Sequence, residues 1–376
     1  MRVLVTSISD ADWVCAPLAQ QPGFEVAAFH PRFVQLGEWG VTRIDDREPR
    51  PYLVRTSAVF PAHPYTASLY LSGLRRLLRE FAPDVIYHLG EPSELGTWQI
   101  IRLARRACPR VRIIVFSMEN IVRQWRGFPR CLRGLAERAT IARIDRVSVC
   151  STSAARAWEQ QGFDPARISI NYVPIDTQLF HRRDASALQA RLASPEQFLV
   201  GYVGRLVPEK GLDLLLRALA SLPERFVVAL AGTGLAETEL RGLAAELGLE
   251  QRVRWLGPVK GEDVPLYMSA FDALVLPSRS IPVWQEQFGR VLPEAMLCGT
   301  PVVGSSSGAI PDVIGEAGLI FPENDHAALA ERLLRLGTDE ALRQQCIERG
   351  LQRAQQEFTP EVMLRRLVAV LQEAAG

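Results

Sequence analysis

The sequence predicts an α/β protein made of two Rossmann-like, doubly wound domains that face each other across a cleft. Short apolar runs alternate with longer amphipathic stretches along the whole chain. This alternation is typical of βαβ units and parallel sheets. The chain has 376 residues, and domains commonly contain roughly 100 to 200 residues. Two tandem domains are therefore expected.

The first half of the chain shows this pattern up to a turn near residue 176. The runs predicted to be strands are 2–6, 24–29, 84–89, 112–117 and 145–151. Leucines at 69, 71, 74, 77 and 78 recur with a helical period, which predicts a helix over 68–81. A proline-containing turn and a polar stretch follow residue 168. We therefore expect an N-terminal domain over 1–176.

The second half repeats the pattern with clearer turn signals. Its predicted strands are 198–204, 225–232, 253–257, 272–278, 300–306 and 317–321. Its predicted helices are 211–222, 236–249, 264–271 and 292–299. These elements give a C-terminal domain over 180–357. The last segment, 358–376, is predicted to be a helix with Thr359 as its N-cap and Pro360 at its first position, and to pack on the N-terminal domain.

Composition excludes several classes of protein. The net charge is +1, which does not suit a nucleic-acid partner. No run approaches the ~18 apolar residues of a membrane span, and the N-terminus turns polar after five residues. We therefore expect no signal peptide and a cytoplasmic location. Six cysteines are scattered without a CxxC pair, so no zinc site is predicted. Asp10 and Asp12 form a DxD motif without a supporting carboxylate cluster, so no other metal is expected, and no cofactor is predicted.

Positive charge is concentrated in the first half of the chain. Residues 1–176 contain 23 Arg against 17 acidic residues, and seven of these Arg lie in 121–146 together with Trp125 and Phe128. A basic, amphipathic stretch can lie on an anionic membrane surface or meet an anionic acceptor. The alternative is an Arg-rich helix face exposed to solvent. Peripheral membrane contact through 121–146 is thus one of two interpretations.

The segment 201–219 places two cations between a strand and a helix. Its sequence, GYVGRLVPEKGLDLLLRAL, contains Arg205 and Lys210 in a glycine-containing loop. Such a loop leads into a helix N-terminus, whose unpaired N–H groups favour phosphate. Arg205 offers a bidentate fork and Lys210 a compact charge. We interpret this loop as a phosphate site.

Two glutamates flank a second loop that leads into a helix. Glu286 and Glu294 lie on either side of Gly289. A carboxylate accepts hydrogen bonds from a vicinal diol, so such a pair can hold a sugar and a ribose. The same pair could instead act as the acid and base of a glycoside hydrolase, although that mechanism does not require the nearby cations. A capping glutamate with a surface glutamate is the alternative without function.

Residues 198–356 resemble the C-terminal domain of glycosyltransferase family 4, which comprises retaining enzymes of the GT-B fold. The resemblance rests on GRLVPEKG at 204–211, LAGTG at 230–234, the spacing from Glu286 to Glu294, EAMLCGTPVV at 294–303 and GAIPDVI at 308–314. It implies transfer of a hexose-type sugar from a nucleoside-diphosphate sugar to a sugar or lipid-linked acceptor, in glycan, glycolipid or polysaccharide biosynthesis. Retention by front-face attack is also implied.

The resemblance assigns roles to individual residues. Arg205, Lys210 and Glu286 are implied to be catalytic, with the cations on the donor diphosphate and Glu286 on the donor sugar. Glu294 is implied to bind the ribose. The remaining implied donor-binding residues are Gly204, Gly232, Gly234, Val259, Phe288, Gly289, Arg290 and Val291.

The first half resembles the family only loosely. The loop after the first strand is SISDAD rather than the usual Gly-Gly turn, and FSMEN places Glu119 where a histidine commonly stands. His88 follows a strand nearby. We expect His88 and Glu119 on the acceptor side. A nucleotide-sugar epimerase of the same fold and a non-catalytic nucleotide-sugar-binding subunit remain the alternatives.

Overall fold

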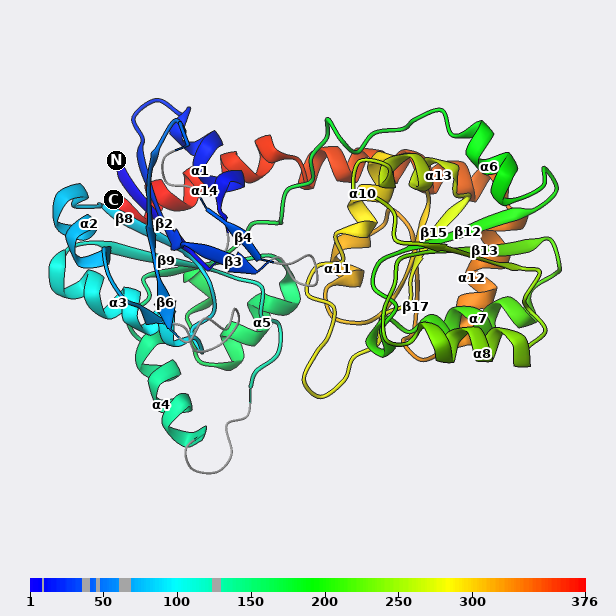
Figure 1. Cartoon of the computed structure of the whole chain (residues 1–376), viewed down its shortest axis with the longest axis horizontal. Helices are drawn as coiled ribbons and strands as arrows, with labels where there is room; N and C mark the ends of the chain where they lie inside the picture. The colour runs from blue at the N-terminus through cyan, green and yellow to red at the C-terminus, as the bar shows by residue number, and fades with distance from the viewer. Residues whose placement is uncertain (9, 36–40, 45–47, 61–68, 124–129) are drawn as a thin grey trace. The chain divides into compact units, whose positions relative to one another are not determined.

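A computed structural model describes residues 1–8, 10–35, 41–44, 48–60, 69–123 and 130–376. The chain divides into two compact units, unit 1 (Met1–Asn171 with Leu364–Gly376) and unit 2 (Tyr172–Met363). Each unit is a parallel sheet with helices connecting its strands (Figure 1). The α/β class and the paired parallel sheets predicted from the sequence are confirmed.

Unit 1 contains a seven-stranded parallel sheet. Its strands, in spatial order, are β11 (Ile168–Ile170), β10 (Arg146–Val149), β9 (Arg112–Ser117), β8 (Val85–Leu89), β1 (Arg2–Ser7), β2 (Glu25–Pro31) and β5 (Leu53–Ser57). Two small antiparallel strand pairs join β3 (Phe33–Gln35) to β4 (Val41–Arg43), and β6 (Val59–Phe60) to β7 (Leu69–Tyr70). Strand β1 lies between β2 and β8, so the strand order reverses beside it.

Helices connect the strands of unit 1, and several of them bury apolar side chains against the sheet. They are α1 (Asp12–Ala19), α2 (Leu74–Phe81), α3 (Leu95–Ala107), α4 (Arg130–Ile141), α5 (Thr152–Gln160) and the 3₁₀ turn Pro165–Arg167. One core joins Leu4 and Ile86 of the sheet with Leu78 of α2, Ile100 of α3 and Trp158 of α5. These strands are apolar on both faces because helices cover both sides of a parallel sheet.

One predicted helix is shorter than expected. The helix predicted over 68–81 begins only at Leu74, because Leu69 and Tyr70 form strand β7. The Tyr70 N–H donates to Gln99 Oε1 at 2.8 Å, and Gly73 adopts a φ of +85° that ends the extended segment. The spacing of the leucines is therefore helical even where the chain forms a strand and a turn, so this spacing alone could not locate the start of the helix.

Unit 2 contains a six-stranded parallel sheet. Its strands, in spatial order, are β14 (Val253–Gly257), β13 (Phe226–Ala231), β12 (Phe198–Val203), β15 (Ala273–Leu276), β16 (Val302–Ser305) and β17 (Leu319–Phe321). Its helical segments are α6 (Ser186–Leu192), the 3₁₀ turn Pro208–Lys210, α7 (Leu212–Ser221), α8 (Glu237–Glu246), α9 (Val264–Ala270), α10 (Val291–Leu297), α11 (Ile310–Ile314), α12 (His326–Thr338) and α13 (Glu340–Glu357).

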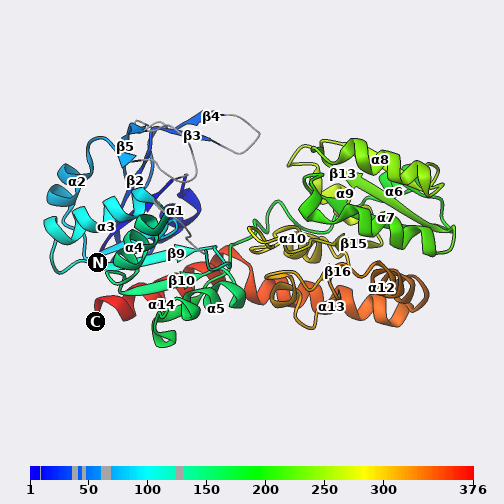
Figure 2. The same ribbon diagram turned by 90° about the horizontal axis from the view of Figure 1, so that it is seen from below.

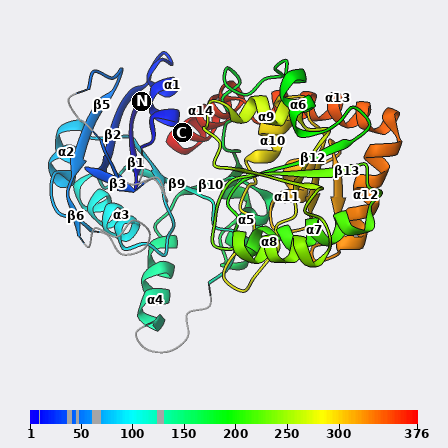
Figure 3. The ribbon, with the colours of Figure 1, turned by 45° about the vertical axis from the view of Figure 1, so that its right-hand side comes forward.

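Helices cover both faces of the unit 2 sheet. In Figures 1 and 3, α7 and α8 lie below its strands, and α6 and α13 lie above them. Strand β12 lies between β13 and β15, so the strand order reverses here. Ligands of open α/β sheets bind beyond the carboxyl ends of the strands at such a point. The loops after β12 and β15 are therefore where a ligand of unit 2 is expected.

The last helix, α14 (Pro360–Ala375), has its first residues in unit 2 and the rest in unit 1. In unit 1 its end lies beside β10 (Figure 2), where Arg146 donates to Glu373 Oε2 at 2.7 Å. None of the helices among the described residues is both long enough and apolar enough to cross a membrane.

Candidate active site

Two glycine turns meet at the carboxyl ends of β12 and β13. Gly204 follows β12 with a φ of +152°, and Gly232 follows β13 with a φ of +143°. A Cβ on Gly232 would stand 1.9 Å from the Gly204 carbonyl oxygen. Leu206 N–H donates to the Thr233 carbonyl at 2.8 Å. A Cβ on Gly232 would thus collide with the main chain of the β12 loop, and both positions have a positive φ that favours glycine.

The third predicted glycine lies in the same turn. A Cβ on Gly234 would stand 2.3 Å from the Leu206 carbonyl oxygen. The backbone of the β12 loop is also held by Tyr202, whose hydroxyl donates to the Arg205 carbonyl at 2.7 Å. The Arg205 side chain is 55% exposed and approaches Glu209 only at 4.0 Å. Its guanidinium therefore remains accessible to a ligand.

The β12 loop also contacts the loop that follows β15. Gly211 has a φ of +66°, and a Cβ on it would stand 2.1 Å from the Pro277 carbonyl oxygen. The 3₁₀ turn Pro208–Lys210 ends there, and α7 begins at Leu212. This close approach brings Lys210 next to residues that follow β15, 76 positions away along the chain.

Lys210 and Glu286, both predicted to be catalytic, form a buried ion pair. Lys210 Nζ lies 2.6 Å from Glu286 Oε2, with side chains 15% and 9% exposed. Ser278 Oγ donates to the same carboxylate oxygen at 2.8 Å. The ammonium also lies 5.0 Å from the centre of the Trp284 ring, within the range of a cation–π interaction. Sequence reasoning missed both Ser278 and Trp284.

Glu294, the predicted ribose ligand, lies in the first turns of α10. Its Oε1 lies 3.3 Å from an Arg290 nitrogen, and the two side chains are 12% and 57% exposed. Burial raises the pKa of Glu294 to about 7, while Arg290 opposes the shift. Burial has the larger effect because the guanidinium is largely hydrated. Glu294 is therefore a half-titrated carboxyl near neutral pH.

The residues between the two glutamates have different surroundings. Phe288 is 2% exposed, and its ring packs against Tyr172 and Phe358 with centroids 6.0 and 5.8 Å apart. Gly289 adopts a φ of +76° with its Cβ position 2.9 Å from Leu276 Cδ2. The Phe288 ring is thus part of the core, so this residue can offer a ligand only its backbone groups.

The other predicted donor-binding residues lie on the same unit. Val291 is the first residue of α10 and is partly buried. Val259 is partly buried in the loop after β14. Unit 2 therefore contains every predicted donor-side residue, and direct contacts join Gly204 to Gly232, Lys210 to Glu286 and Arg290 to Glu294.

The two predicted acceptor-side residues lie in unit 1 and have different surroundings. His88, at 1% exposure, has Nδ1 2.8 Å from Thr6 Oγ1 and Nε2 2.7 Å from Thr97 Oγ1. Burial lowers the pKa of His88 to about 4, so the imidazole is neutral. Glu119 instead forms an ion pair with Arg123 at 2.5 Å. The roles of His88 and Glu119 stay predictions.

Two further carboxyls lie near them. Glu91 accepts from Ser117 Oγ at 2.5 Å and from the N–H groups of Met118 and Glu119 at 2.9 and 3.1 Å. Burial raises the pKa of Glu91 to about 7, and burial together with the Glu91 charge raises that of Glu94 to about 8. Sequence reasoning missed Glu94, which lies immediately before the first residue of α3.

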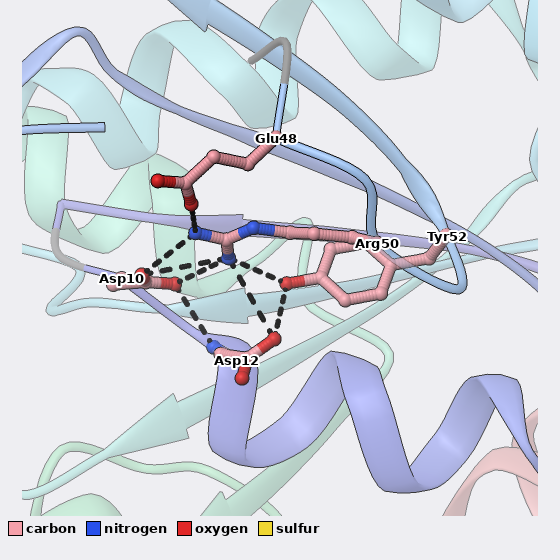
Figure 4. Close-up of polar contacts among 5 residues, drawn as sticks. All are labelled: Asp10, Asp12, Glu48, Arg50 and Tyr52. Atoms are coloured by element: carbon pink, nitrogen blue, oxygen red, sulfur yellow. Dashed lines mark hydrogen bonds and ion pairs between the residues drawn. The ribbon is translucent and has the colours of Figure 1, made fainter. Parts of the chain in front are cut away.

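The acidic loop after β1 is engaged within the chain. Arg50 lies 3.3 Å from Asp10, 3.6 Å from Asp12 and 3.6 Å from Glu48 (Figure 4). Arg50 also donates to the Tyr52 hydroxyl at 2.8 Å, and that hydroxyl donates to Asp12 at 2.6 Å. Over the described ranges, no group of three or more His, Cys, Asp or Glu side chains could hold a metal ion.

Family models match both units. Residues 12–174 match the glycosyl transferase 4-like domain, and residues 185–353 match the glycosyl transferases group 1 domain. Together the two models span most of the chain. The chain therefore belongs to the glycosyltransferases of family 4 type, which have the GT-B fold. The resemblance found in the sequence is confirmed.

Individual relatives agree with this family. The D-inositol 3-phosphate glycosyltransferase of Mycobacterium sp. (strain KMS) is 36% identical over 202 residues, which are 52% of this chain and 45% of the relative. The match thus spans about half the length of that relative. Among solved structures, Anabaena HepE in complex with UDP has a TM-score of 0.76 at 21% identity, covering 99% of this chain and 100% of that chain. Sucrose-phosphate synthase from Thermosynechococcus elongatus has a TM-score of 0.72 at 21% identity, covering 99% and 98%.

Proposed function

We propose that the chain is a retaining glycosyltransferase that moves a hexose-type sugar from a nucleoside-diphosphate sugar to an acceptor hydroxyl. The observation that carries this proposal is the Lys210–Glu286 pair beside exposed Arg205 at the switch point of unit 2. Cations suit the diphosphate and a carboxylate suits sugar hydroxyls. The coexistence of both in one loop cluster favours a ligand that contains both groups.

The proposed chemistry requires little from a nucleophilic side chain. The bond between the anomeric carbon and the diphosphate oxygen breaks, and its electron pair leaves with the nucleoside diphosphate. The acceptor oxygen attacks the same face and its proton passes to the leaving phosphate, which gives retention. Negative charge grows on the phosphate during this step, so fixed cations stabilise the transition state. In this proposal Arg205 and Lys210 supply that charge, and no metal takes part.

We propose UDP as the nucleotide. Neighbouring structures of Anabaena HepE contain UDP and UDP-glucose, and their fold is shared with this chain. Glu294 would accept the ribose hydroxyls, and the backbone near Val259 would meet the base. Because a ribose diol donates hydrogen bonds to a carboxylate, the ionised form of Glu294 is the one that binds.

A binding experiment tests the donor site. Thermal unfolding is measured with UDP, GDP and ADP and with their glucose conjugates, on the wild type, Glu294→Ala and the control Glu237→Ala. A ligand at 100 times its Kd stabilises by ~2.7 kcal/mol. The proposal expects the UDP series to raise the melting temperature of the wild type and the control only. A wild type that no nucleotide stabilises would contradict the donor site.

Product analysis separates the alternatives. Incubation with UDP-glucose alone should convert the sugar if the chain is an epimerase. A chain that is only a binding subunit should give no turnover of UDP-glucose with any acceptor. A hydrolase would release sugar from a glycoside without any nucleotide. The transferase expects UDP release that depends on an acceptor. D-inositol 3-phosphate is the first acceptor to test, because the name of a sequence relative contains it.

The Arg-rich segment 121–146 bears on the acceptor and on the location of the protein. We infer a sugar or lipid-linked acceptor and contact of 121–146 with an anionic membrane surface, on the cytoplasmic side. Residues 124–129 lie outside the described residues; on α4, Leu135 is 60% exposed beside exposed Arg138. Sedimentation with phosphatidylglycerol vesicles at low salt tests this idea. Protein that stays in the supernatant at every vesicle concentration would contradict membrane contact.

A further inference from the structure

The Lys210 ammonium occupies a position between a carboxylate and an aromatic ring. It lies 2.6 Å from Glu286 Oε2 and 5.0 Å from the Trp284 ring centre. Both charged side chains are largely removed from solvent. In this arrangement the proposed phosphate ligand and the proposed sugar ligand neutralise each other. A diphosphate that draws the ammonium toward itself would separate this pair.

The carboxylate is fixed more firmly than the ammonium. Ser278 Oγ donates to Glu286 Oε2 at 2.8 Å. The Glu286 carbonyl accepts from Ala309 N–H at 2.9 Å, and a Cβ on Gly308 would stand 2.1 Å from that carbonyl oxygen. Lys210, in contrast, has a flexible four-carbon stem. When a diphosphate attracts Lys210, the ammonium is the group that moves, and Glu286 stays where it is.

The cost of that movement depends on the ligand. Separating a buried ion pair leaves a buried charge without its counter-ion, which is strongly unfavourable. A nucleoside diphosphate alone would draw Lys210 away and leave Glu286 without this partner. A nucleoside-diphosphate sugar would bring a hydroxyl that replaces the ammonium as donor to Glu286. The two ligands differ by one hydrogen bond to a buried carboxylate.

We propose that the Lys210–Glu286 ion pair makes the site discriminate in favour of the nucleotide sugar and against the nucleoside diphosphate that remains after transfer. This inference rests on the donor site under Proposed function. Its consequence is that release of the product nucleotide becomes easier, because Lys210 returns to Glu286 once the sugar has gone. Lys210 and Glu286 therefore determine which ligand the site prefers, in addition to binding the phosphate and the sugar.

The choice of lysine agrees with an exchange of partners. The chain contains 41 Arg but only two Lys, at 210 and 260. An Arg at position 210 could bind the carboxylate through two parallel hydrogen bonds, which would oppose its release. A lysine makes single, re-orientable contacts. A chain that uses arginine almost everywhere thus has lysine at the position where the cation must change partners.

Isothermal titration of UDP and UDP-glucose tests the proposal. The variant Glu286→Gln keeps the shape of the side chain but removes the charge that holds Lys210. We expect UDP to bind this variant about tenfold more tightly than the wild type, a change of the size that a hydrogen bond to a charged group contributes. UDP-glucose should gain nothing or bind more weakly. The ratio of the two dissociation constants therefore falls.

A matched variant controls for loss of charge in unit 2. Glu237 forms an ion pair with Arg241 at 2.8 Å on the surface of α8, so Glu237→Gln should leave both dissociation constants unchanged. If Glu286→Gln binds UDP no more tightly than the wild type does, the proposal is overturned. If the wild type binds neither ligand, the donor site itself is wrong. The two failures are distinguishable.

A measurement on the wild type applies even if Glu286→Gln does not fold. UDP is titrated with and without saturating free glucose. Because bound glucose can donate to the Glu286 carboxylate that UDP has exposed, glucose should tighten UDP binding several-fold, and UDP should tighten glucose binding by the same factor. An affinity for UDP that is the same with and without glucose would overturn the proposal.

Discussion

The Gly204 carbonyl oxygen lies 1.9 Å from the position that a Cβ on Gly232 would occupy. Replacing Gly232 by Ala must therefore push the β12 and β13 loops apart, and its φ of +143° is unfavourable for alanine as well. We expect Gly232→Ala to lose about 2 kcal/mol of unfolding free energy and most UDP binding. Chemical denaturation and calorimetric titration measure the two effects.

A second glycine in unit 2 provides the control. Gly242 is in the exposed interior of α8, and a Cβ there would meet nothing within 4 Å. Gly242→Ala should stabilise the chain by about 0.5 to 1 kcal/mol, because alanine is the better helix former, and should leave UDP binding unchanged. Normal UDP binding by Gly232→Ala would show that the contact between the two loops does not shape the site.

The raised pKa of Glu294 should make the stability of the folded chain depend on pH. Burial raises its pKa to about 7 from the ordinary value of 4.5. Between these two pH values the carboxyl is protonated in the folded chain and ionised in the unfolded chain. The contribution to stability is full below pH about 4.5 and is lost as the pH rises through about 7. Glu294→Gln should therefore raise stability at pH 8 by on the order of 2 kcal/mol and change little at pH 4.5.

Thermal unfolding of both proteins across this range measures the effect. UDP affinity provides an independent readout, since the ionised carboxyl is the proposed ribose ligand. Wild-type affinity should rise as the pH passes through about 7, whereas that of Glu294→Gln should stay low and constant. A constant stability difference between the two proteins from pH 4.5 to 8 would contradict the raised pKa of Glu294.

The residues proposed to bind the donor were identified from the sequence, and all of them lie in unit 2; their role in binding stays a prediction. Gly204, Lys210 and Glu286 belong to short sequence motifs. In these motifs the glycines mark turns with a positive φ, and the charged residues lie within a few positions of them. Ser278 and Trp284 could not be assigned in this way. Their contacts with Glu286 and Lys210 depend on how the loop after β15 folds back, and neither residue type indicates that geometry.

Unit 1 was less predictable for a different reason. Arg50 contacts Asp10 across 40 residues, and nothing near Arg50 distinguishes it from the many other arginines of the chain. The helix predicted over 68–81 was wrong at Leu69 and Tyr70, because Gln99 of α3 pairs with the Tyr70 backbone, while residue 68 lies outside the described residues. Tertiary contacts of this kind override a local period.

Arg50 is expected to stabilise the folded chain. Its side chain is 14% exposed and contacts three acidic residues and the Tyr52 hydroxyl. Arg50→Ala removes the cation between Asp10 and Asp12 and leaves these carboxylates to repel each other. Because hydrogen bonds to charged groups contribute about 1.5 to 3 kcal/mol, we expect a loss of about 2 kcal/mol in urea denaturation.

The control for Arg50 is another arginine of unit 1. Arg76 is 82% exposed in its ion pair with Glu80 on α2, so Arg76→Ala should cost less than about 0.5 kcal/mol. Tyr52→Phe removes only the hydroxyl and should give an intermediate loss. Equal stabilities of the Arg50 and Arg76 variants would mean that the cluster in Figure 4 contributes nothing to folding.

The lowered pKa of His88 should destabilise the folded chain in acid. Burial in the core lowers its pKa to about 4 from the ordinary value of 6.5, and the hydrogen bond with Thr6 opposes this shift only in part. The stability that it contributes is present above pH 6.5 and is lost as the pH falls toward 4, since only the unfolded chain takes up the proton. His88→Asn, which cannot titrate, should lose less stability than the wild type between pH 6.5 and 4. Urea denaturation at several pH values measures this difference, and an NMR titration in which the His88 ring becomes protonated near pH 6.5 would contradict it.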